Sequence, residues 1–361
     1  MRLAPLTLVC VLACAAACGS RESGGPQASA ANINLNGAGA TFPYPLYSKW
    51  VAEYERRDPR VRINYQSIGS GGGIRQITER TVDFGASDAP MTPEQLARAP
   101  GKLVHIPMTL GAVVVTYNLP NAPASLKLGP EAVTGIFLGE ITKWDDPRLA
   151  ALNPGVTLPA QTITVVHRTD GSGTTAVFTD YLAKVSPAWK EKVGTGTSVR
   201  WPAGVGGKGN EGVAGTVKTT PGALGYVELA YAIQTKLPYA HLRNRAGQFV
   251  EPAIPSITAA AAGHVVRAIA PAREADELAV SITDPAGEQA YPIAAFTYVL
   301  VYQDAPDRAK GEALAQFFWW AIHDGQALAP ALHYAPLPPA VVTKVEARLK
   351  SLTAGGQPLL P

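Results

Sequence analysis

The chain has 361 residues, of which 47% are hydrophobic and 16% are charged, and its formal net charge at pH 7 is +3. This composition is typical of a globular protein and excludes a disordered or fibrous chain, and the length predicts two domains at roughly 150 residues each. The charge is nearly balanced, and the sequence has no run of basic residues and no stripe of aromatic and basic residues that would suggest binding to nucleic acid.

Residues 1–17 are predicted to be a secretory signal peptide, because a basic start precedes a short apolar stretch that ends in small residues. All three cysteines, Cys10, Cys14 and Cys18, fall in or next to this segment, so disulfides do not stabilise the rest of the chain. They could be chance residues of an apolar leader. The sequence Ala-Ala-Ala-Cys at Cys18 instead resembles a bacterial lipoprotein signal, with Cys14 as the alternative lipidation site. Residues 18–34 are then a flexible tether.

Beyond the tether, segments with helical and strand-like periodicity alternate. Residues 46–57 are predicted to form a helix, with Leu46, Trp50, Val51 and Tyr54 on one face. Further strands are expected at 61–65, 82–88, 111–118, 163–168, 223–229 and 296–302, and further helices at 69–80, 176–185 and 256–263. This order predicts an α/β architecture with mostly parallel sheets, in which ligands bind beyond the carboxyl ends of strands. No later stretch is long and apolar enough to span a bilayer.

Three segments, 37–43, 67–73 and 170–175, combine glycines with a hydroxyl residue at a predicted helix start. Unpaired N–H groups and the helix dipole attract anions there, glycine permits close approach, and hydroxyls add donors. A single such segment is typical of a turn or an N-cap, but three together favour anion binding. The guanidinium of Arg168 could add a planar fork for an oxyanion, and a surface ion pair with Asp170 is the compatible alternative.

Five blocks of the sequence resemble the phosphate-binding protein of high-affinity phosphate ABC transporters. They are residues 36–50, 68–90, 139–147, 168–185 and 201–217. The resemblance continues more weakly towards the C-terminus. It implies a two-lobed α/β fold of the type II periplasmic-binding-protein class, with a ligand cleft between lobes that two crossing strands join. Lobe I would comprise residues 35–115 plus 265–361, and lobe II residues 116–264.

The resemblance also implies a function: a monomer without cofactor binds inorganic phosphate in the cleft and delivers it to the permease and ATPase subunits of an ABC transporter. The protein would be exported to the periplasm or the cell-envelope surface and contact the membrane only through a lipid anchor. The implied phosphate-binding residues are Thr41, Phe42, Ser70, Asp88, Arg168, Ser172, Gly173 and Thr174, with Asp170 holding Arg168 in place. His167 is expected to lie at a strand end, away from the ligand.

Asp88 is the residue that would select the anion. An ionised carboxylate only accepts hydrogen bonds, so it suits phosphate, which keeps a proton near neutral pH, and repels sulfate, which has none. The alternative role for Asp88 is to cap the helix that begins near Thr92.

Two other functions fit part of the pattern. A phosphatase or phosphotransferase would use Ser172 as a nucleophile, but the candidate base His167 lies five residues away, and no metal pair or G-x-S-x-G motif is present. A protein that binds sulfate or molybdate would have no use for Asp88. The six histidines show no metal-ligand spacing, and Trp144 and Trp201 are predicted to pack beneath turns. We therefore expect a binding protein and not an enzyme.

Overall fold

The computed structural model describes residues 32–120, 125–265 and 277–361, and Asn32–Pro361 forms one compact unit. The predicted signal peptide, most of the tether and Cys18 lie outside the described residues. Within the described ranges, no helix combines the length and the hydropathy needed to cross a membrane.

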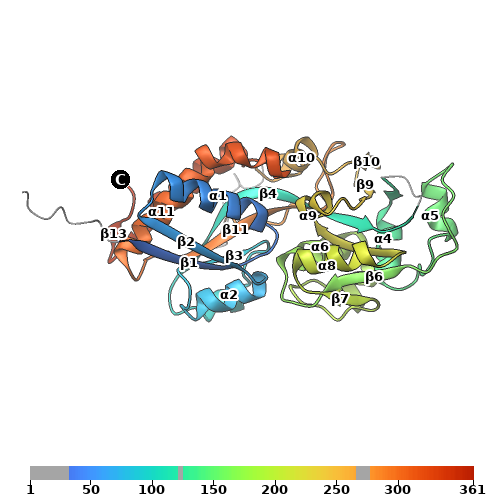
Figure 1. The fold of residues 1–361 in the computed structure, drawn as a ribbon, viewed down its shortest axis with the longest axis horizontal. Helices are drawn as coiled ribbons and strands as arrows, with labels where there is room; N and C mark the ends of the chain where they lie inside the picture. Colours follow the sequence, from blue (N-terminus) through green and yellow to red (C-terminus); the bar gives the residue numbers. More distant parts are fainter. Residues whose placement is uncertain (1–31, 121–124, 266–276) are drawn as a thin grey trace, which may run out of the picture. The chain divides into compact units, whose positions relative to one another are not determined.

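An eight-stranded sheet runs through this unit in the order β2-β1-β3-β11-β4-β8-β6-β7 (Figure 1). Its strands are β1 (Ile33–Gly39), β2 (Val61–Ser67), β3 (Phe84–Ser87), β4 (Leu103–Tyr117), β6 (Thr164–Arg168), β7 (Val205–Gly207), β8 (Ala223–Glu228) and β11 (Ala294–Tyr302). Strand β1 pairs in parallel with β2 and β3, and β6 pairs in parallel with β7 and β8. We call β2, β1 and β3 with their helices the first half, and β8, β6 and β7 with theirs the second half.

Strand β4 belongs to both halves. All 15 of its residues are buried, and it pairs with β11 through residues 103–112 and with β8 through residues 113–117. Figure 1 shows β4 reaching from the strands of the first half to those of the second. The pairings of β11 with β3, of β11 with β4 and of β4 with β8 are antiparallel. The predicted parallel pairing therefore applies to the outer strands, because the chain passes between the halves at the centre of the sheet and then returns.

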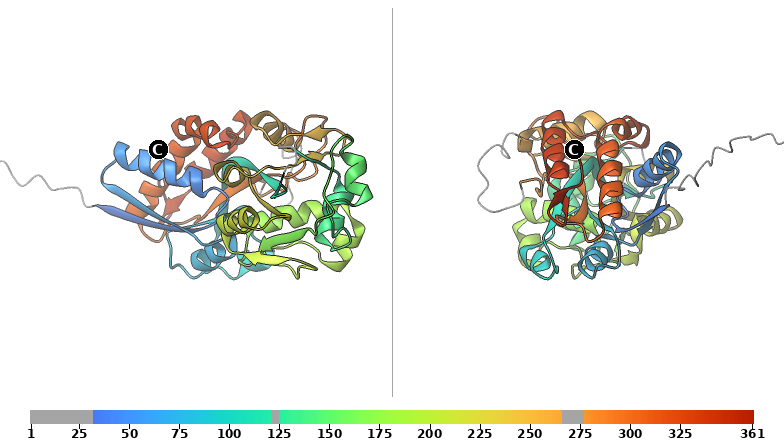
Figure 2. Two further views of the ribbon diagram at one scale, coloured as in Figure 1. Left: turned by 45° about the vertical axis from the view of Figure 1, so that its right-hand side comes forward. Right: turned by 90° about the vertical axis from the view of Figure 1, so that its left-hand side faces the viewer.

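The first half combines both ends of the described chain. Its helices are α1 (Tyr44–Arg57), α2 (Ser70–Thr78), α3 (Pro93–Ala97), α11 (Arg308–Ile322) and α12 (Pro339–Lys350), with the short turns η2 (Asp324–Leu328) and η3 (Pro330–Leu332) and the hairpin β12 (Thr353–Ala354) and β13 (Gln357–Pro358). Aromatic packing joins α1 to α11, with the rings of Tyr54 and Phe317 5.0 Å apart. Figures 1 and 2 show the C-terminal helices beside α1.

The second half is built from the middle of the chain. Its helices are α4 (Pro130–Phe137), α5 (Pro147–Leu152), α6 (Gly173–Val185), α7 (Pro187–Lys192), α8 (Gly209–Thr219) and α9 (Leu229–Gln234). A small sheet consists of β5 (Lys127–Leu128), β9 (His241–Arg243) and β10 (Phe249–Val250). Helix α10 (Ile254–Val265) follows β10 in the chain. Trp144 is fully buried and donates a 2.9 Å hydrogen bond to the carbonyl of Gly222. Trp201 packs against Tyr226 and Trp189. Both tryptophans are packing residues, as predicted.

Candidate functional site

Three helices begin where the sequence combines glycine with a hydroxyl residue. Helix α1 follows segment 37–43, α2 starts at Ser70, and α6 starts at Gly173. The loops before α2 and α6 touch: the Gly71 N–H donates to the Gly171 carbonyl at 2.8 Å, and the Gly173 N–H donates to Ser70 Oγ at 3.0 Å. Two of the predicted anion-binding loops therefore meet, although they come from different halves of the sheet.

Close approach of the two loops requires glycine at position 173. A Cβ on Gly173 would collide with Ser70 Oγ and would lie 2.6 Å from Asp88 Oδ2. The backbone of the second half is thus in direct contact with Ser70 and Asp88 of the first. The first N–H groups of helix α6 lie beside these side chains, where the positive end of the helix dipole favours an anion.

Asp88 follows strand β3 and is 3% exposed. The hydroxyl of Thr297 on β11 donates to its Oδ1 at 2.9 Å, whereas its buried Oδ2 has no hydrogen-bond partner in the part of the chain that the structure describes. Burial raises the pKa of Asp88 to about 7, although Thr297 and the positive charge of Arg168 act in the opposite direction. The carboxyl therefore changes its charge near neutral pH, which the sequence did not indicate.

The alternative role of Asp88 as a helix cap is wrong. Thr92 caps α3 itself, since its side chain accepts a hydrogen bond from the Gln95 N–H while the Gln95 side chain accepts one from the Thr92 N–H. This reciprocal capping box satisfies the start of the helix without Asp88. The free oxygen of Asp88 is directed towards the loops instead.

Arg168 ends strand β6 and is 4% exposed, and its partner Asp170 is partly buried, so the ion pair is not an exposed surface pair. Its Nε and Nη2 donate to the two carboxylate oxygens of Asp170 at 2.7 and 2.5 Å, and its Nη1 lies 3.5 Å from Thr174 Oγ1.

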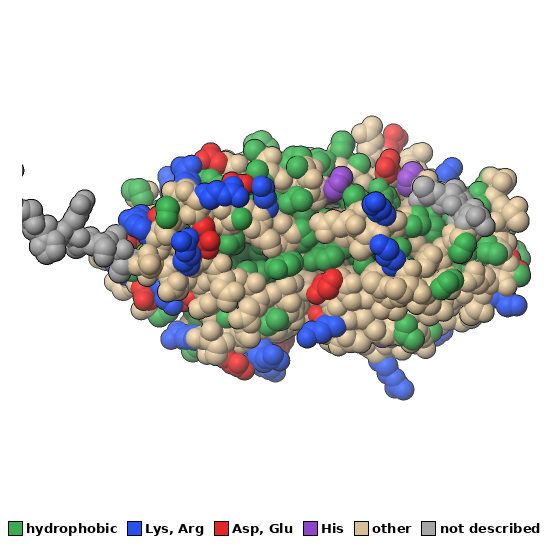
Figure 3. All heavy atoms as spheres, viewed as in Figure 1, with side chains coloured by type: hydrophobic (Ala, Val, Ile, Leu, Met, Phe, Trp, Pro, Cys, Tyr) green, Lys and Arg blue, Asp and Glu red, His purple; other side chains and the backbone are tan. Residues whose placement is uncertain are grey.

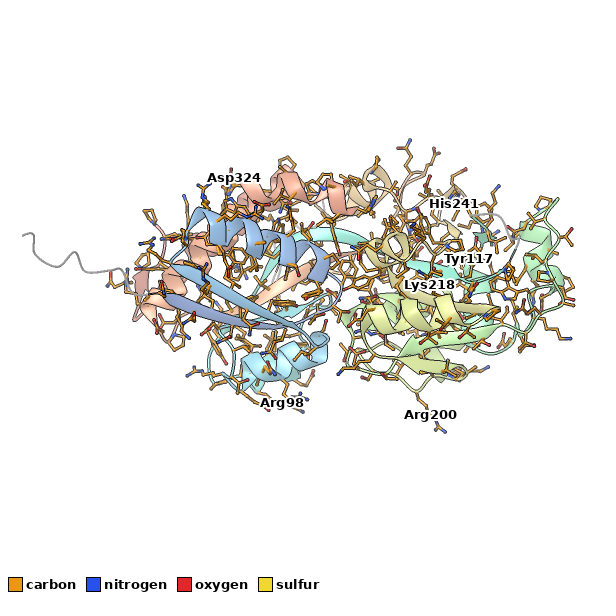
Figure 4. The ribbon with its side chains drawn as sticks, in the orientation of Figure 1. Arg98, Tyr117, Arg200, Lys218, His241 and Asp324 are labelled. Carbon is orange, nitrogen blue, oxygen red and sulfur yellow. The ribbon has the colours of Figure 1, made fainter. Side chains whose placement is uncertain are left out.

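Other arginines lie at the surface. Arg98 and Arg200 are exposed, and Figure 4 shows Arg200 pointing away from the ribbon. Figure 3 shows basic and acidic side chains interspersed over one face of the molecule.

Asp170 binds the edge of the guanidinium that carries Nε and Nη2. Burial alone would raise the pKa of Asp170, but the hydrogen bonds and the charge of Arg168 outweigh it and lower that pKa below its usual value. The Gly209 N–H adds a 3.0 Å hydrogen bond to Oδ1 of the same carboxylate. An ion pair with two hydrogen bonds fixes the guanidinium plane and leaves Nη1 directed towards Thr174.

The remaining predicted residues are also buried. Thr41, Phe42, Ser172 and Thr174 are at most 2% exposed. The hydroxyl of Tyr231 donates to the Thr41 carbonyl at 2.6 Å, and that of Tyr334 donates to the Phe42 carbonyl at 2.7 Å. These two tyrosines fix the backbone of the loop before α1.

Ser172 and His167 are not arranged as a nucleophile and a base. Ser172 Oγ accepts a hydrogen bond from the Thr175 N–H and caps α6. The ring of His167 stacks on Trp201, with ring centres 5.0 Å apart and an interplanar angle of 12°, and burial lowers its pKa. Among the described residues, no group of three or more His, Cys, Asp or Glu side chains could hold a metal ion.

Four side chains around the site escaped the sequence reasoning. Asn210 bonds both Thr41 and Thr174, Thr297 bonds Asp88, and Tyr231 and Tyr334 hold the loop before α1. Asn210 lies inside one of the five blocks that carry the family resemblance, so its position could have drawn attention. Tyr334 follows a turn near the C-terminus and carries no local signal.

Comparisons with known proteins agree with this arrangement. Residues 25–324 match the family model described as PBP superfamily domain. The chain is 48% identical over 317 residues to the Phosphate-binding protein PstS of Xylella fastidiosa, covering 88% of this chain and 85% of that one. It is 47% identical over 318 residues to the protein of the same name from Pasteurella multocida, covering 88% and 90%.

A solved structure supports the fold independently. The phosphate-binding protein from Stenotrophomonas maltophilia superposes with a TM-score of 0.68 over 88% of this chain and 94% of its own, at only 19% identity. The predicted two-lobed periplasmic-binding-protein fold is thereby confirmed. The chain belongs to the PstS family of phosphate-binding proteins within the PBP superfamily.

Proposed function

We propose that this chain binds inorganic phosphate between its two lobes and delivers it to the permease of a phosphate ABC transporter. The proposal rests on two opposite groups that are buried at one place. One is the guanidinium of Arg168 with the start of α6, and the other is Oδ2 of Asp88, which has no hydrogen-bond partner among the described residues. The cationic side suits the oxygens of an anion, and the carboxylate suits a proton on that anion. Phosphate carries both features near neutral pH, and PstS relatives are named for binding it.

The proposed phosphate-binding residues come from both lobes. They are Thr41, Phe42, Ser70 and Asp88 from lobe I and Arg168, Ser172, Gly173 and Thr174 from lobe II, with Asp170 behind Arg168. We place lobe I at residues 35–115 plus 265–361 and lobe II at residues 116–264. The change of partner along β4, from β11 to β8 after residue 112, supports this division.

Release to the transporter follows from the same arrangement. Contacts between the lobes include the hydrogen bonds from Gly173 to Ser70 and from Gly71 to Gly171. Opening of the lobes would break these contacts and separate Asp88 from α6, which removes part of the site. Binding, closure, docking on the permease and opening then form the transport cycle. The protein acts as a monomer in this cycle.

Calorimetric titration of the purified protein with phosphate, arsenate and sulfate tests the proposal. At about pH 8.5, where the Asp88 carboxyl is charged, phosphate and arsenate, which carry a proton, should bind, and sulfate should bind at least tenfold more weakly. Equal affinity for sulfate, or no binding of phosphate to protein stripped of bound anion, would contradict it. A parallel assay of phosphate ester hydrolysis tests the enzymatic alternative, and we expect no rate above the uncatalysed one.

We further propose that the protein is exported and held to a membrane by a lipid on Cys18. The support is the sequence of residues 1–34 alone: a signal peptide, small residues before the cysteine and a polar tether. Several acyl chains on one cysteine would give stable anchoring. Cys18→Ala should release the protein from the membrane fraction and leave phosphate binding unchanged, with Cys14→Ala as the matched control. Release by Cys14→Ala and retention by Cys18→Ala would identify Cys14 as the lipidated residue.

A further inference from the structure

Asn210 connects two of the proposed phosphate-binding residues across the lobes. It is the second residue of α8 and is fully buried. Its side-chain Nδ2 donates to Thr41 Oγ1 at 2.7 Å in lobe I and to Thr174 Oγ1 at 3.1 Å in lobe II. Its backbone N–H also lies 3.3 Å from Thr41 Oγ1. One side chain therefore uses both of its amide protons on the two threonine hydroxyls.

The orientation of this amide is fixed from behind. The backbone N–H of Glu228, at the end of β8, donates to Asn210 Oδ1 at 2.9 Å. A flipped amide would place its NH₂ group against that N–H donor and would lose the bond. The nitrogen of Asn210 must therefore face Thr41 and Thr174.

This orientation decides what the two hydroxyls can do. A threonine hydroxyl has one proton to donate and two lone pairs that accept. Thr41 Oγ1 accepts from the side chain and the backbone of Asn210, and Thr174 Oγ1 accepts from Asn210 and from Arg168 Nη1. With their lone pairs used inside the protein, both hydroxyls keep the proton for an acceptor in the cleft.

We propose that Asn210 is a positioning residue for phosphate: it sets the hydroxyls of Thr41 and Thr174 as hydrogen-bond donors to the anion and links the two lobes. The proposal rests on the proposed function, since it concerns the same cleft. Asn210 acts through the threonines, because both of its amide protons are already used on them. The hydroxyl oxygens of Ser70 and Ser172 also accept hydrogen bonds from N–H groups of the protein, so their protons likewise remain for another acceptor. The site thus presents hydroxyl protons, which suit the oxygens of an anion.

Titration of variants with phosphate tests this role. Asn210→Ala should raise the Kd for phosphate at least tenfold. Asn153→Ala is the matched control, because Asn153 is also a buried asparagine whose amide donates to two oxygens and accepts from one N–H, but it holds Lys127 and Leu149. This control should lower the melting temperature and leave the Kd within about twofold of the wild type. An unchanged Kd in Asn210→Ala would overturn the proposal.

Two further measurements separate hydroxyl positioning from packing. Asn210→Leu fills the same space without donors, so the polarity argument predicts that affinity stays low, whereas a packing role predicts that it recovers. In a Thr41→Val background, the fold-increase in Kd caused by Asn210→Ala should be at least threefold smaller than in the wild-type background. The reason is that one of the two hydroxyls that Asn210 orients is absent. Recovery in Asn210→Leu, or equal losses in both backgrounds, would overturn the proposal. If the wild-type protein binds no phosphate at all, the proposed function fails instead.

Discussion

Asp88→Asn should weaken the discrimination of the site against sulfate. In the structure, the Thr297 hydroxyl donates to Oδ1 of Asp88. The other oxygen, Oδ2, is buried beside Gly173 and has no hydrogen-bond partner in residues 32–120, 125–265 and 277–361. Because the Thr297 hydroxyl donates a hydrogen bond, the amide oxygen of the new asparagine should occupy the position of Oδ1. Its amide nitrogen should then occupy the position of Oδ2. Sulfate then meets a donor where the wild type presents a carboxylate. Phosphate exchanges one hydrogen bond for another, so its affinity should change little.

The pKa of Asp88 gives the size of the effect. Burial raises this pKa to about 7, so the carboxyl becomes charged as the pH rises through that value. Sulfate has no proton and fits the wild-type site only beside the neutral carboxyl. Forming the neutral carboxyl at about pH 8.5 costs about 2 kcal/mol, or roughly thirtyfold in affinity. The sulfate affinity of the wild type should therefore fall about tenfold per pH unit above about 7, and that of the variant should not.

Calorimetric titration of both anions into both proteins, at about pH 7 and about pH 8.5 and at fixed ionic strength, measures this effect. The ratio of phosphate to sulfate affinity should fall by at least tenfold in the variant at the higher pH. Thermal unfolding of the two proteins without anion serves as the control for correct folding. If the ratio is unchanged, or if the wild type binds sulfate equally well at both pH values, Asp88 does not contact the proton of the ligand and the reasoning on specificity fails.

Two other substitutions test the site by the same titration. Arg168→Ala should weaken phosphate binding at least tenfold, since charge-assisted hydrogen bonds contribute roughly 1.5–3 kcal/mol, and Arg168→Lys should restore only part because an ammonium lacks the planar fork. Wild-type affinity in Arg168→Ala would show that the guanidinium serves only Asp170. Gly173→Ala should also lower the affinity at least tenfold, because its Cβ would push against Ser70 and Asp88. Gly215→Ala on α8, where a Cβ meets nothing within 4 Å, is its matched control, and equal affinities in the two glycine variants would contradict the argument.

The sequence by itself determined the local structure at the site. Glycine and hydroxyl residues before apolar periodic segments predicted helix starts, and α2 and α6 begin there. Hydroxyl groups of this kind cap helices through bonds that span only a few residues, as the Ser172 side chain does with the Thr175 N–H. The ion pair of Arg168 with Asp170 was foreseen for the same reason, since the two residues are only two positions apart.

Only the tertiary structure decided how these pieces combine. Asn210 lies 169 residues from Thr41, and Thr297 lies 209 residues from Asp88, so no local pattern relates them. Likewise, the antiparallel centre of the sheet arises because β4 pairs with β11 in one half and with β8 in the other. The pKa of Asp88 depends on how completely distant segments remove water from its carboxyl. Local sequence sets backbone conformation over a few residues, whereas desolvation and the polarity of a hydroxyl depend on atoms that meet only after folding.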